Sequence, residues 1–165
     1  MRNITINLRI SFDLVPHNLL CDKLLRYGCD DITLKWFKSY LKDRYQYVKC
    51  DNSISNIKKI GDLSVPQGSI LGPLLFIIYM NDIVNLPLNG NITLFADDIT
   101  LIYEAKNYKE LEMHMNDDMK SISSWLMANK LVINIDKSNF MIMGRPLKKH
   151  EFKRILQQSS SEESQ

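Results

Sequence analysis

The sequence has few of the features that mark membrane, secreted or metal-cluster proteins. It contains no run of roughly 18 apolar residues, which excludes a membrane-spanning helix of ordinary length. Its amino terminus (MRNITINLRI) lacks the long apolar stretch and small-residue cleavage site of a signal peptide. Three cysteines, Cys21, Cys29 and Cys50, are odd in number and match no metal-ligand spacing. We therefore expect an intracellular protein with reduced thiols and no membrane partner.

What is present fits one globular domain of modest size. The chain has 165 residues, of which 45% are hydrophobic and 24% charged, and this length can bury a sizeable core. Its last segment ends in QQSSSEESQ, a composition that cannot build a core. We therefore expect an ordered domain over residues 1–144 and a disordered polar tail over residues 145–165.

The charges are distributed unevenly along the chain. Residues 35–59 hold seven Lys or Arg against Asp43 and Asp51, whereas residues 97–118 hold seven acidic residues against Lys106 and Lys109. One interpretation is a basic half that faces a polyanion and an acidic half that holds metal. The other is that most of these charges lie on the solvated faces of amphipathic helices. Charge alone leaves both open.

Periodicity predicts a mixture of helices and strands. The expected elements are helices over 16–27, after Asp30 or Asp31, and over 70–79; a strand over 45–50 and a polar connector over 51–62; a hairpin of 92–96 and 99–103; a helix to about residue 128 with Leu111, Met115, Met119, Ile122 and Leu126 on one face; and a strand pair of 131–135 and 140–143. This order predicts an α+β fold, with helices packed on one face of an antiparallel sheet.

The pair Asp97-Asp98 carries the clearest chemical signal. Two adjacent carboxylates in a tight turn repel each other, and apolar flanking residues such as Phe95 and Ile99 keep the local dielectric low. A divalent cation relieves that repulsion, and Mg²⁺ binds through one or two carboxylates plus substrate phosphates. The alternative is that Asp-Asp is only a favourable turn dipeptide.

Several ordered stretches resemble reverse transcriptases, the RNA-directed DNA polymerases, in the style of jockey-like non-LTR retrotransposons. FADD at 95–98 resembles the catalytic box, and SVPQGSILGPLLF at 64–76 resembles the motif that positions substrate and template. The others are FDLVPHNLL at 12–20, the end of the first catalytic motif; NIDKS at 134–138, the lysine motif; and WFKSYL at 36–41 with RYQYV at 44–48. The resemblance covers roughly residues 7–144.

The resemblance implies a polymerase palm fold and a role for each matching residue. Asp97 and Asp98 would hold the metal ions, Mg²⁺ or alternatively Mn²⁺, and Lys137 would assist at the pyrophosphate leaving group. Phe12 would screen the sugar 2′ position of the nucleotide. The remaining nucleotide- and template-binding positions are Pro66, Gln67, Gly68 and Ser69. The implied partners are an RNA template, a DNA primer and deoxynucleoside triphosphates.

The sequence departs from the family at one catalytic position. The family pattern D-x-x-x-A-F-D is NLRISFD here, so Asn7 stands where the third metal-binding aspartate is expected. An amide keeps an oxygen donor but loses the negative charge that attracts Mg²⁺. Fingers and thumb regions are also largely missing, so we expect a truncated and impaired polymerase palm. The alternatives are an inactive transposon remnant that at most binds nucleic acid, and a translated fragment without a stable fold.

Overall fold

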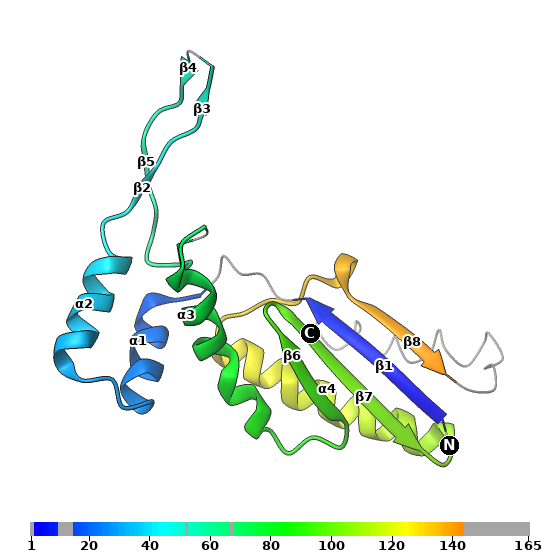
Figure 1. The fold of residues 1–165 in the computed structure, drawn as a ribbon. Helices are drawn as coiled ribbons and strands as arrows, with labels where there is room; N and C mark the ends of the chain where they lie inside the picture. The colour runs from blue at the N-terminus through cyan, green and yellow to red at the C-terminus, as the bar shows by residue number, and fades with distance from the viewer. Residues whose placement is uncertain (1, 10–14, 52, 67, 144–165) are drawn as a thin grey trace, which may run out of the picture. The chain divides into compact units, whose positions relative to one another are not determined.

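The computed structural model describes residues 2–9, 15–51, 53–66 and 68–143. These form two compact units (Figure 1). Among the described residues, the sheet unit comprises 2–9, 84–126 and 133–143, and the helical unit comprises 15–51, 53–66, 68–83 and 127–132. The expected tail, residues 145–165, lies outside the described residues. We describe each unit by itself.

The elements follow one another as one strand, two helices, a ribbon, a helix, a hairpin and a long helix before the last strand. Their bounds are β1 (Arg2–Arg9), α1 (His17–Arg26), α2 (Asp31–Leu41), β2 (Tyr45–Gln46), β3 (Lys49–Cys50), β4 (Ser53–Ile54), β5 (Lys58–Lys59), α3 (Leu71–Met80), the 3₁₀-helix η2 (Asn81–Asn85), β6 (Asn91–Phe95), β7 (Asp98–Ala105), α4 (Tyr108–Ala128), the 3₁₀-helix η3 (Ile135–Lys137) and β8 (Asn139–Met143). The predicted α+β class is confirmed.

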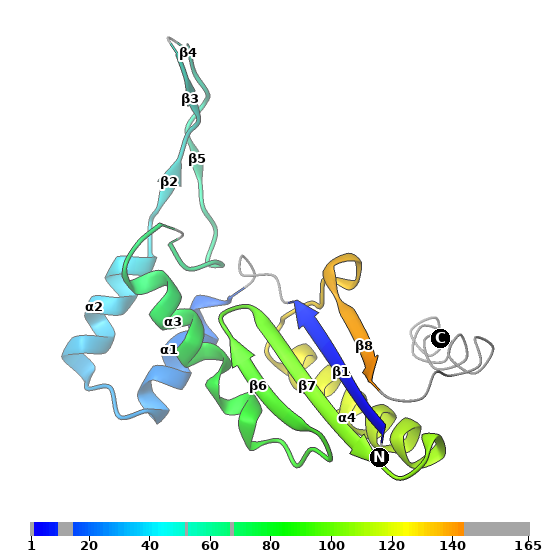
Figure 2. The ribbon, with the colours of Figure 1, turned by 45° about the vertical axis from the view of Figure 1, so that its right-hand side comes forward.

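The sheet unit is built on a four-stranded antiparallel sheet in the order β6-β7-β1-β8. Along β7, Ile99, Leu101 and Tyr103 are buried, and the alternate residues are more exposed. Such alternation gives a strand one core face and one open face. The long helix α4 covers the core face (Figure 2) with Leu111 and Ile122 among its buried residues.

A buried carboxylate on α4 fixes the turn that enters β6. Asp118 is 1% exposed. Its two carboxylate oxygens accept hydrogen bonds of 2.8–2.9 Å from the backbone N–H and the side-chain amide of Asn89 and from the backbone N–H of Gly90. Position 90 favours glycine, because a Cβ there would lie 2.6 Å from the Tyr103 ring. The buried Asp118 carboxylate is thus satisfied by donors of a turn whose own residues, Asn89 and Gly90, are exposed and half-buried.

The helical unit forms where local signals are strong. Pro16 precedes α1, and Gly28, with φ +87°, follows it in a conformation that suits glycine. Asp30 caps α2 by accepting a 2.7 Å hydrogen bond from the backbone N–H of Thr33. The predicted helices over 16–27 and 70–79 are confirmed as α1 and α3 within a few residues. Gly72 and Pro73 lie in the first turn of α3, where proline is tolerated.

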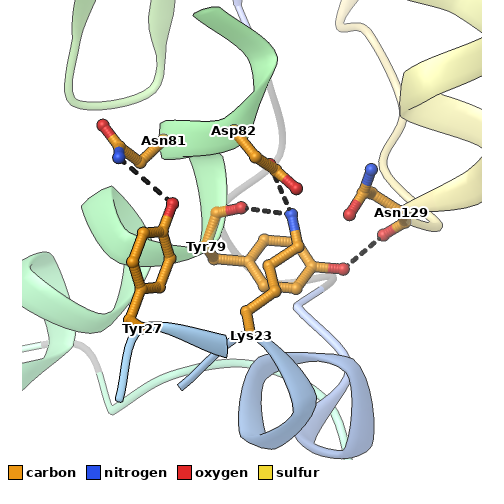
Figure 3. Close-up of polar contacts among 6 residues, drawn as sticks. All are labelled: Lys23, Tyr27, Tyr79, Asn81, Asp82 and Asn129. Carbon is orange, nitrogen blue, oxygen red and sulfur yellow. Dashed lines mark hydrogen bonds and ion pairs between the residues drawn. The ribbon is translucent and has the colours of Figure 1, made fainter. Parts of the chain in front are cut away.

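A buried lysine connects α1 to the end of α3 (Figure 3). The ammonium of Lys23 donates to the Tyr79 carbonyl at 2.6 Å and to Oδ1 of Asp82 at 2.7 Å, and it lies 4.5 Å from the centre of the Tyr79 ring. The Tyr79 hydroxyl donates to the carbonyl of Asn129 at 2.6 Å. Burial lowers the pKa of Lys23, and the hydrogen bond and charge of Asp82 oppose that shift. The cluster ties three chain segments together.

A two-stranded ribbon follows α2, and it corrects one prediction. The expected strand over 45–50 is two short strands, β2 and β3, and the expected connector over 51–62 is in large part the returning arm. Tyr45 pairs with Lys59, and Lys49 pairs with Ile54. The polar composition of 51–62 hid the returning arm because its side chains bury almost nothing and show no apolar alternation.

The predicted closing strand pair is also wrong. Of its two segments, 140–143 belongs to β8, which pairs with β1, whereas Leu131 is a buried residue of the helical unit. Register explains the error, because a β-prone run pairs with the strand that offers a complementary edge, and β1 lies more than a hundred residues upstream.

Candidate active site

The turn between β6 and β7 presents the two aspartates. Phe95 is the register partner of Asp98, so the turn residues are Ala96 and Asp97, and Asp98 is already the first residue of β7. The hairpin was predicted correctly, but its turn lies one residue earlier than the expected Asp97-Asp98 pair. Both aspartates are half-buried. Asp97 in the turn and Asp98 at the start of β7 therefore place two adjacent carboxylates at this end of the sheet.

Ala96 adopts a conformation that alanine normally avoids. Its φ is +51°, in the left-handed region where a Cβ approaches the following carbonyl oxygen. Two-residue hairpin turns need a positive φ at the first central residue, and glycine usually occupies that position. The strain amounts to roughly 1–2 kcal/mol, and it occurs beside the acidic pair, as strained residues often do at functional sites.

Asn7 occupies the adjacent strand at the same end of the sheet. On β1 it is the register partner of Thr100 on β7 and of Asn139 on β8. Thr100 lies two residues along β7 from Asp98, whose own partner is Arg9. The register thus places Asn7, where the resemblance implies a metal-binding aspartate, and the acidic pair on neighbouring strands of one sheet.

Lys137 lies at the same end of the sheet, in the segment that leads into β8. It is the last residue of η3, two residues before Asn139, the partner of Asn7. The Oδ1 of Asn134 accepts a 3.2 Å hydrogen bond from the backbone N–H of Lys137, and the Ser138 hydroxyl donates to the Asn134 carbonyl at 2.7 Å. The Lys137 side chain is exposed. Asn134 and Ser138 of the NIDKS stretch therefore shape the turn that carries the lysine.

The stretch that resembles the template-positioning motif lies in the helical unit. Ser69 accepts a 3.0 Å hydrogen bond from the backbone N–H of Gly72, and its hydroxyl donates to the Pro66 carbonyl at 2.7 Å. Gly68 has a φ of +77°, a backbone conformation that glycine adopts without the steric cost that other residues have. Gln67 lies outside the described residues. The tight turn into α3 thus accounts for the residue types at two of the four expected positions, Gly68 and Ser69.

Phe12 also lies outside the described residues, between β1 and α1. The structure therefore brings together, within the sheet unit, the positions Asn7, Asp97, Asp98 and Lys137. The segment with Pro66, Gly68 and Ser69 belongs to the helical unit.

The donor set suits a hard cation that is completed by its substrate. Among residues 2–143, apart from the undescribed gaps, no group of three or more His, Cys, Asp and Glu side chains could hold a metal ion. Two carboxylates, Asp97 and Asp98, are present, and Mg²⁺ binds through one or two carboxylates with water and phosphate oxygens. Asp97 and Asp98 are the carboxylates that could hold such an ion, without the negative charge that an aspartate at position 7 would add.

Sequence reasoning missed the residues that hold this end of the sheet in place. Thr100, Asn139 and Arg9 are the register partners of the site, yet nothing in their local sequence points to it. Asp118 had a signal, because it falls between the apolar positions Met115 and Ile122 on the buried face of α4.

Within the described part of the chain, no helix is long and apolar enough to cross a membrane.

Comparison with known proteins identifies relatives over most of the chain. The family described as reverse transcriptase (RNA-dependent DNA polymerase) matches residues 3–160. The chain is 29% identical over 148 residues to the probable RNA-directed DNA polymerase from transposon BS of Drosophila melanogaster, covering 82% of this chain and 16% of that protein. It is 27% identical over 142 residues to the RNA-directed DNA polymerase from mobile element jockey of the same organism, covering 80% and 15%.

A third relative and a solved structure agree with these matches. The probable RNA-directed DNA polymerase from transposon X-element, also of Drosophila melanogaster, is 33% identical over 106 residues, which cover 62% of this chain and 12% of that protein. The chain thus spans about a sixth or less of the length of these relatives. A structure of telomerase from Candida albicans with a TWJ fragment of telomeric RNA matches 89% of this chain and 27% of its own, with a TM-score of 0.56 and 13% identity. The fold is therefore of the polymerase palm type, and the chain belongs to the reverse transcriptase family, in its jockey-like non-LTR retrotransposon branch.

Proposed function

We propose that this chain supplies the palm of an RNA-directed DNA polymerase that transfers deoxynucleotides to a DNA primer under the direction of an RNA template. The observation that supports this most is the register of the sheet unit. It gathers Asp98, the Asn7 position and the strand that follows Lys137 at one end of four strands, with Asp97 in the adjoining turn. These residues come from three chain segments that are far apart in the sequence.

In this reaction the primer 3′ oxygen forms a bond to the α-phosphorus of the nucleotide, and the bond to the bridging oxygen of pyrophosphate breaks. Asp97 and Asp98 would hold the divalent ions, which lower the pKa of the attacking hydroxyl and neutralise phosphate charge when bound. Lys137 would place its ammonium near the leaving group, where it stabilises the developing negative charge. Its exposure leaves the ammonium accessible to a substrate phosphate.

Pro66, Gln67, Gly68 and Ser69 would contact the template base and the nucleotide, and Phe12 would screen the sugar. The hydrogen bonds of Ser69 to Pro66 and Gly72 link the start of this turn to the first turn of α3. The positive φ of Gly68, with no heavy atom within 4 Å of a built Cβ, leaves its backbone open to a ligand. An open turn suits close contact with a base pair.

Primer extension on an RNA template with Mg²⁺ or Mn²⁺ tests this proposal. It compares the unmodified chain with Asn7→Asp and Asp97→Asn, and with Asp117→Asn as a control that removes an exposed carboxylate from α4 of the same unit. Extension by the unmodified chain or by Asn7→Asp, lost in Asp97→Asn and kept in Asp117→Asn, supports the proposal. If no variant extends the primer, this palm does not act by itself.

The loss of charge at Asn7 favours a second candidate, an inactive palm that only binds nucleic acid. The two differ in what the Asn7→Asp variant does. Recovery of extension identifies Asn7 as the lesion in an otherwise competent site. Absence of extension together with retained RNA binding supports the inactive palm.

A further inference from the structure

The ribbon of the helical unit, residues 42–60 apart from Asn52, has no role in the proposed catalytic site. Its side chains are almost all exposed, including Tyr45, Tyr47 and Lys49 at alternating positions of the outgoing arm. Figure 1 shows the two arms extending together beyond the end of α2. A ribbon of two strands that buries so little gains almost no stability from its own packing. Its residue types therefore need another explanation.

The charges of the ribbon favour an anionic partner. It carries five cations and two aspartates. Both aspartates occupy turn positions with positive φ, +52° at Asp43 and +49° at Asp51, where aspartate is tolerated for conformational reasons. Asp43 is also paired with Lys59 at 2.6 Å. The acidic residues thus have local structural roles.

Three of the five cations lack such roles. Lys42, Lys49 and Lys58 are exposed, and none has an ion pair with a residue that the structure describes. Arg44 differs, because it is half-buried and its carbonyl accepts a hydrogen bond from Ile60 at the base of the ribbon. Three exposed lysines spread along both arms offer contacts to phosphates at separate points of one strand.

Exposed aromatic rings accompany these lysines. Tyr45 and Tyr47 are 61% and 58% exposed. On α2, which leads into the ribbon, Trp36 is 53% exposed and stacks on Tyr40, with ring centres 5.5 Å apart and planes 7° from parallel. Aromatic rings beside cations are the usual components of surfaces that bind single strands, where bases stack on the rings and lysines contact phosphates.

We infer that the ribbon and the exposed face of α2 form a binding arm for single-stranded nucleic acid, separate from the nucleotide site of the sheet unit. The cations Lys42, Lys49 and Lys58 contact the phosphates, and Tyr45 and Tyr47 stack on bases without reading their sequence. The inference rests on the proposed function only for the choice of RNA as the ligand to test. The charge and the exposed rings stand without it.

The test measures binding of a labelled oligouridine RNA to the full chain by fluorescence anisotropy, between about 50 and 200 mM KCl. The test variant changes Lys42, Lys49 and Lys58 to Gln. The matched control changes Lys106, Lys109 and Lys120 to Gln, three exposed lysines of the sheet unit, so that net charge falls equally. Circular dichroism establishes that both variants are folded.

Loss of three phosphate contacts should reduce the slope of log K against log salt by about 2, since each contact on a single strand contributes roughly 0.7. The control triple variant should keep the slope of the unmodified chain. The double variant Tyr45→Ala with Tyr47→Ala should weaken binding about tenfold or more with little change in slope, because stacking is not ionic.

Equal slopes in the test and control triple variants, or no RNA binding by the folded chain at the lowest salt, would overturn the inference. The second result would favour a protein surface as the partner of these exposed rings. Asp97→Asn distinguishes this inference from the proposed function, because it should abolish primer extension and leave the RNA affinity unchanged. Binding through the ribbon without extension by any variant would support the arm and contradict the polymerase.

Discussion

Asn7 of β1 lies in register with Thr100 of β7, two residues along that strand from Asp98. Position 7 therefore lies on the strand next to the two aspartates of the proposed metal site, and a third carboxylate there increases the attraction for a divalent ion.

We expect Asn7→Asp to bind Mn²⁺ at least about tenfold more tightly than the unmodified chain, which corresponds to about 1.4 kcal/mol. Isothermal titration calorimetry measures this directly. Asn3→Asp is the control, because Asn3 lies on the same strand but pairs with Glu104 and Met143 toward the other end. Equal gains in both variants would show that the effect comes from added charge and not from the site.

The strain at Ala96 predicts a substitution that stabilises the sheet unit. Ala96→Gly should raise the free energy of unfolding by about 1 kcal/mol, because glycine adopts a φ of +51° without the Cβ penalty. Urea denaturation measures the change. Ala105→Gly, at the buried end of β7, should instead lower the free energy of unfolding, because it removes a packed methyl group and increases the conformational entropy of the unfolded chain. Destabilisation by Ala96→Gly would contradict the strain.

Local sequence predicted the elements whose signals are close together in the chain. The caps at Asp30 and Gly28, the apolar positions of α4 and the two runs of the β6–β7 hairpin each lie within one segment, and each element was found. The pairing of β8 with β1 joins residues that are more than 130 positions apart, as in Asn7 with Asn139, and no periodicity encodes such a partner.

The same limit applies to the candidate site. Asp97 and Asp98 could be singled out because the signal is a dipeptide in a turn, and the resemblance to reverse transcriptases added Asn7 and Lys137. The strand partners of Asn7 could not be predicted, because Thr100 and Asn139 lie beside it only through the pairing of strands that are distant in the sequence. The returning arm of the ribbon was missed for another reason. Its side chains pack against no core, so its sequence shows no alternation of apolar and polar residues.

Gly72 gives a prediction for the helical unit. A Cβ at this position would collide with the backbone carbonyl oxygen of Pro66, which cannot move without opening the turn held by Ser69. We expect Gly72→Ala to lower the free energy of unfolding by about 1–3 kcal/mol, the usual range for overpacking. Gly61→Ala is the matched control, because a Cβ at Gly61 meets no heavy atom within 4 Å. Similar thermal melts for the two variants would contradict this packing.

Two buried tyrosines predict loss of stability at alkaline pH. Burial, with the negative charge of Asp118 or Asp82 nearby, raises the pKa of Tyr103 and of Tyr79 well above the usual value of 10.0. The unfolded chain therefore releases these protons first, so their contribution is fully present below pH 10 and is lost as the pH rises above it, by up to about 1.4 kcal/mol per pH unit for each group. The lowered pKa of Lys23 acts in the opposite direction up to about pH 10.5, because unfolding then takes up a proton.

Urea denaturation at several pH values from about 9 to 11 measures this dependence, with Tyr103→Phe as the test. The variant should lose less stability per pH unit than the unmodified chain, since it no longer contains one of the two groups. Tyr47→Phe is the control, because that side chain is 58% exposed. A pH dependence that is the same in Tyr103→Phe and the unmodified chain would show that the Tyr103 proton is not linked to folding.

The Lys23 cluster of Figure 3 gives the last prediction. Lys23→Met keeps the length of the side chain but removes the donor to the Tyr79 carbonyl and to Asp82, and it removes the cation beside the Tyr79 ring. Because Lys23 is 8% exposed, the partners left behind are only partly able to turn to water. We expect a loss of about 1–3 kcal/mol, the cost of an unsatisfied buried group. Lys35→Met, at an exposed position of α2, should change stability by less than about 0.5 kcal/mol.

A double-mutant cycle with Asp82→Asn separates the ion pair from the carbonyl contact. The Asp82 side chain is 36% exposed, so water replaces part of its interaction with Lys23, and its single loss should be the smaller one. The remaining stabilisation then includes the hydrogen bond with the Tyr79 carbonyl, which binds α1 to the end of α3, and the contact of the ammonium with the Tyr79 ring. If Asp82→Asn costs as much as Lys23→Met, the charge pair dominates and the carbonyl contact contributes little.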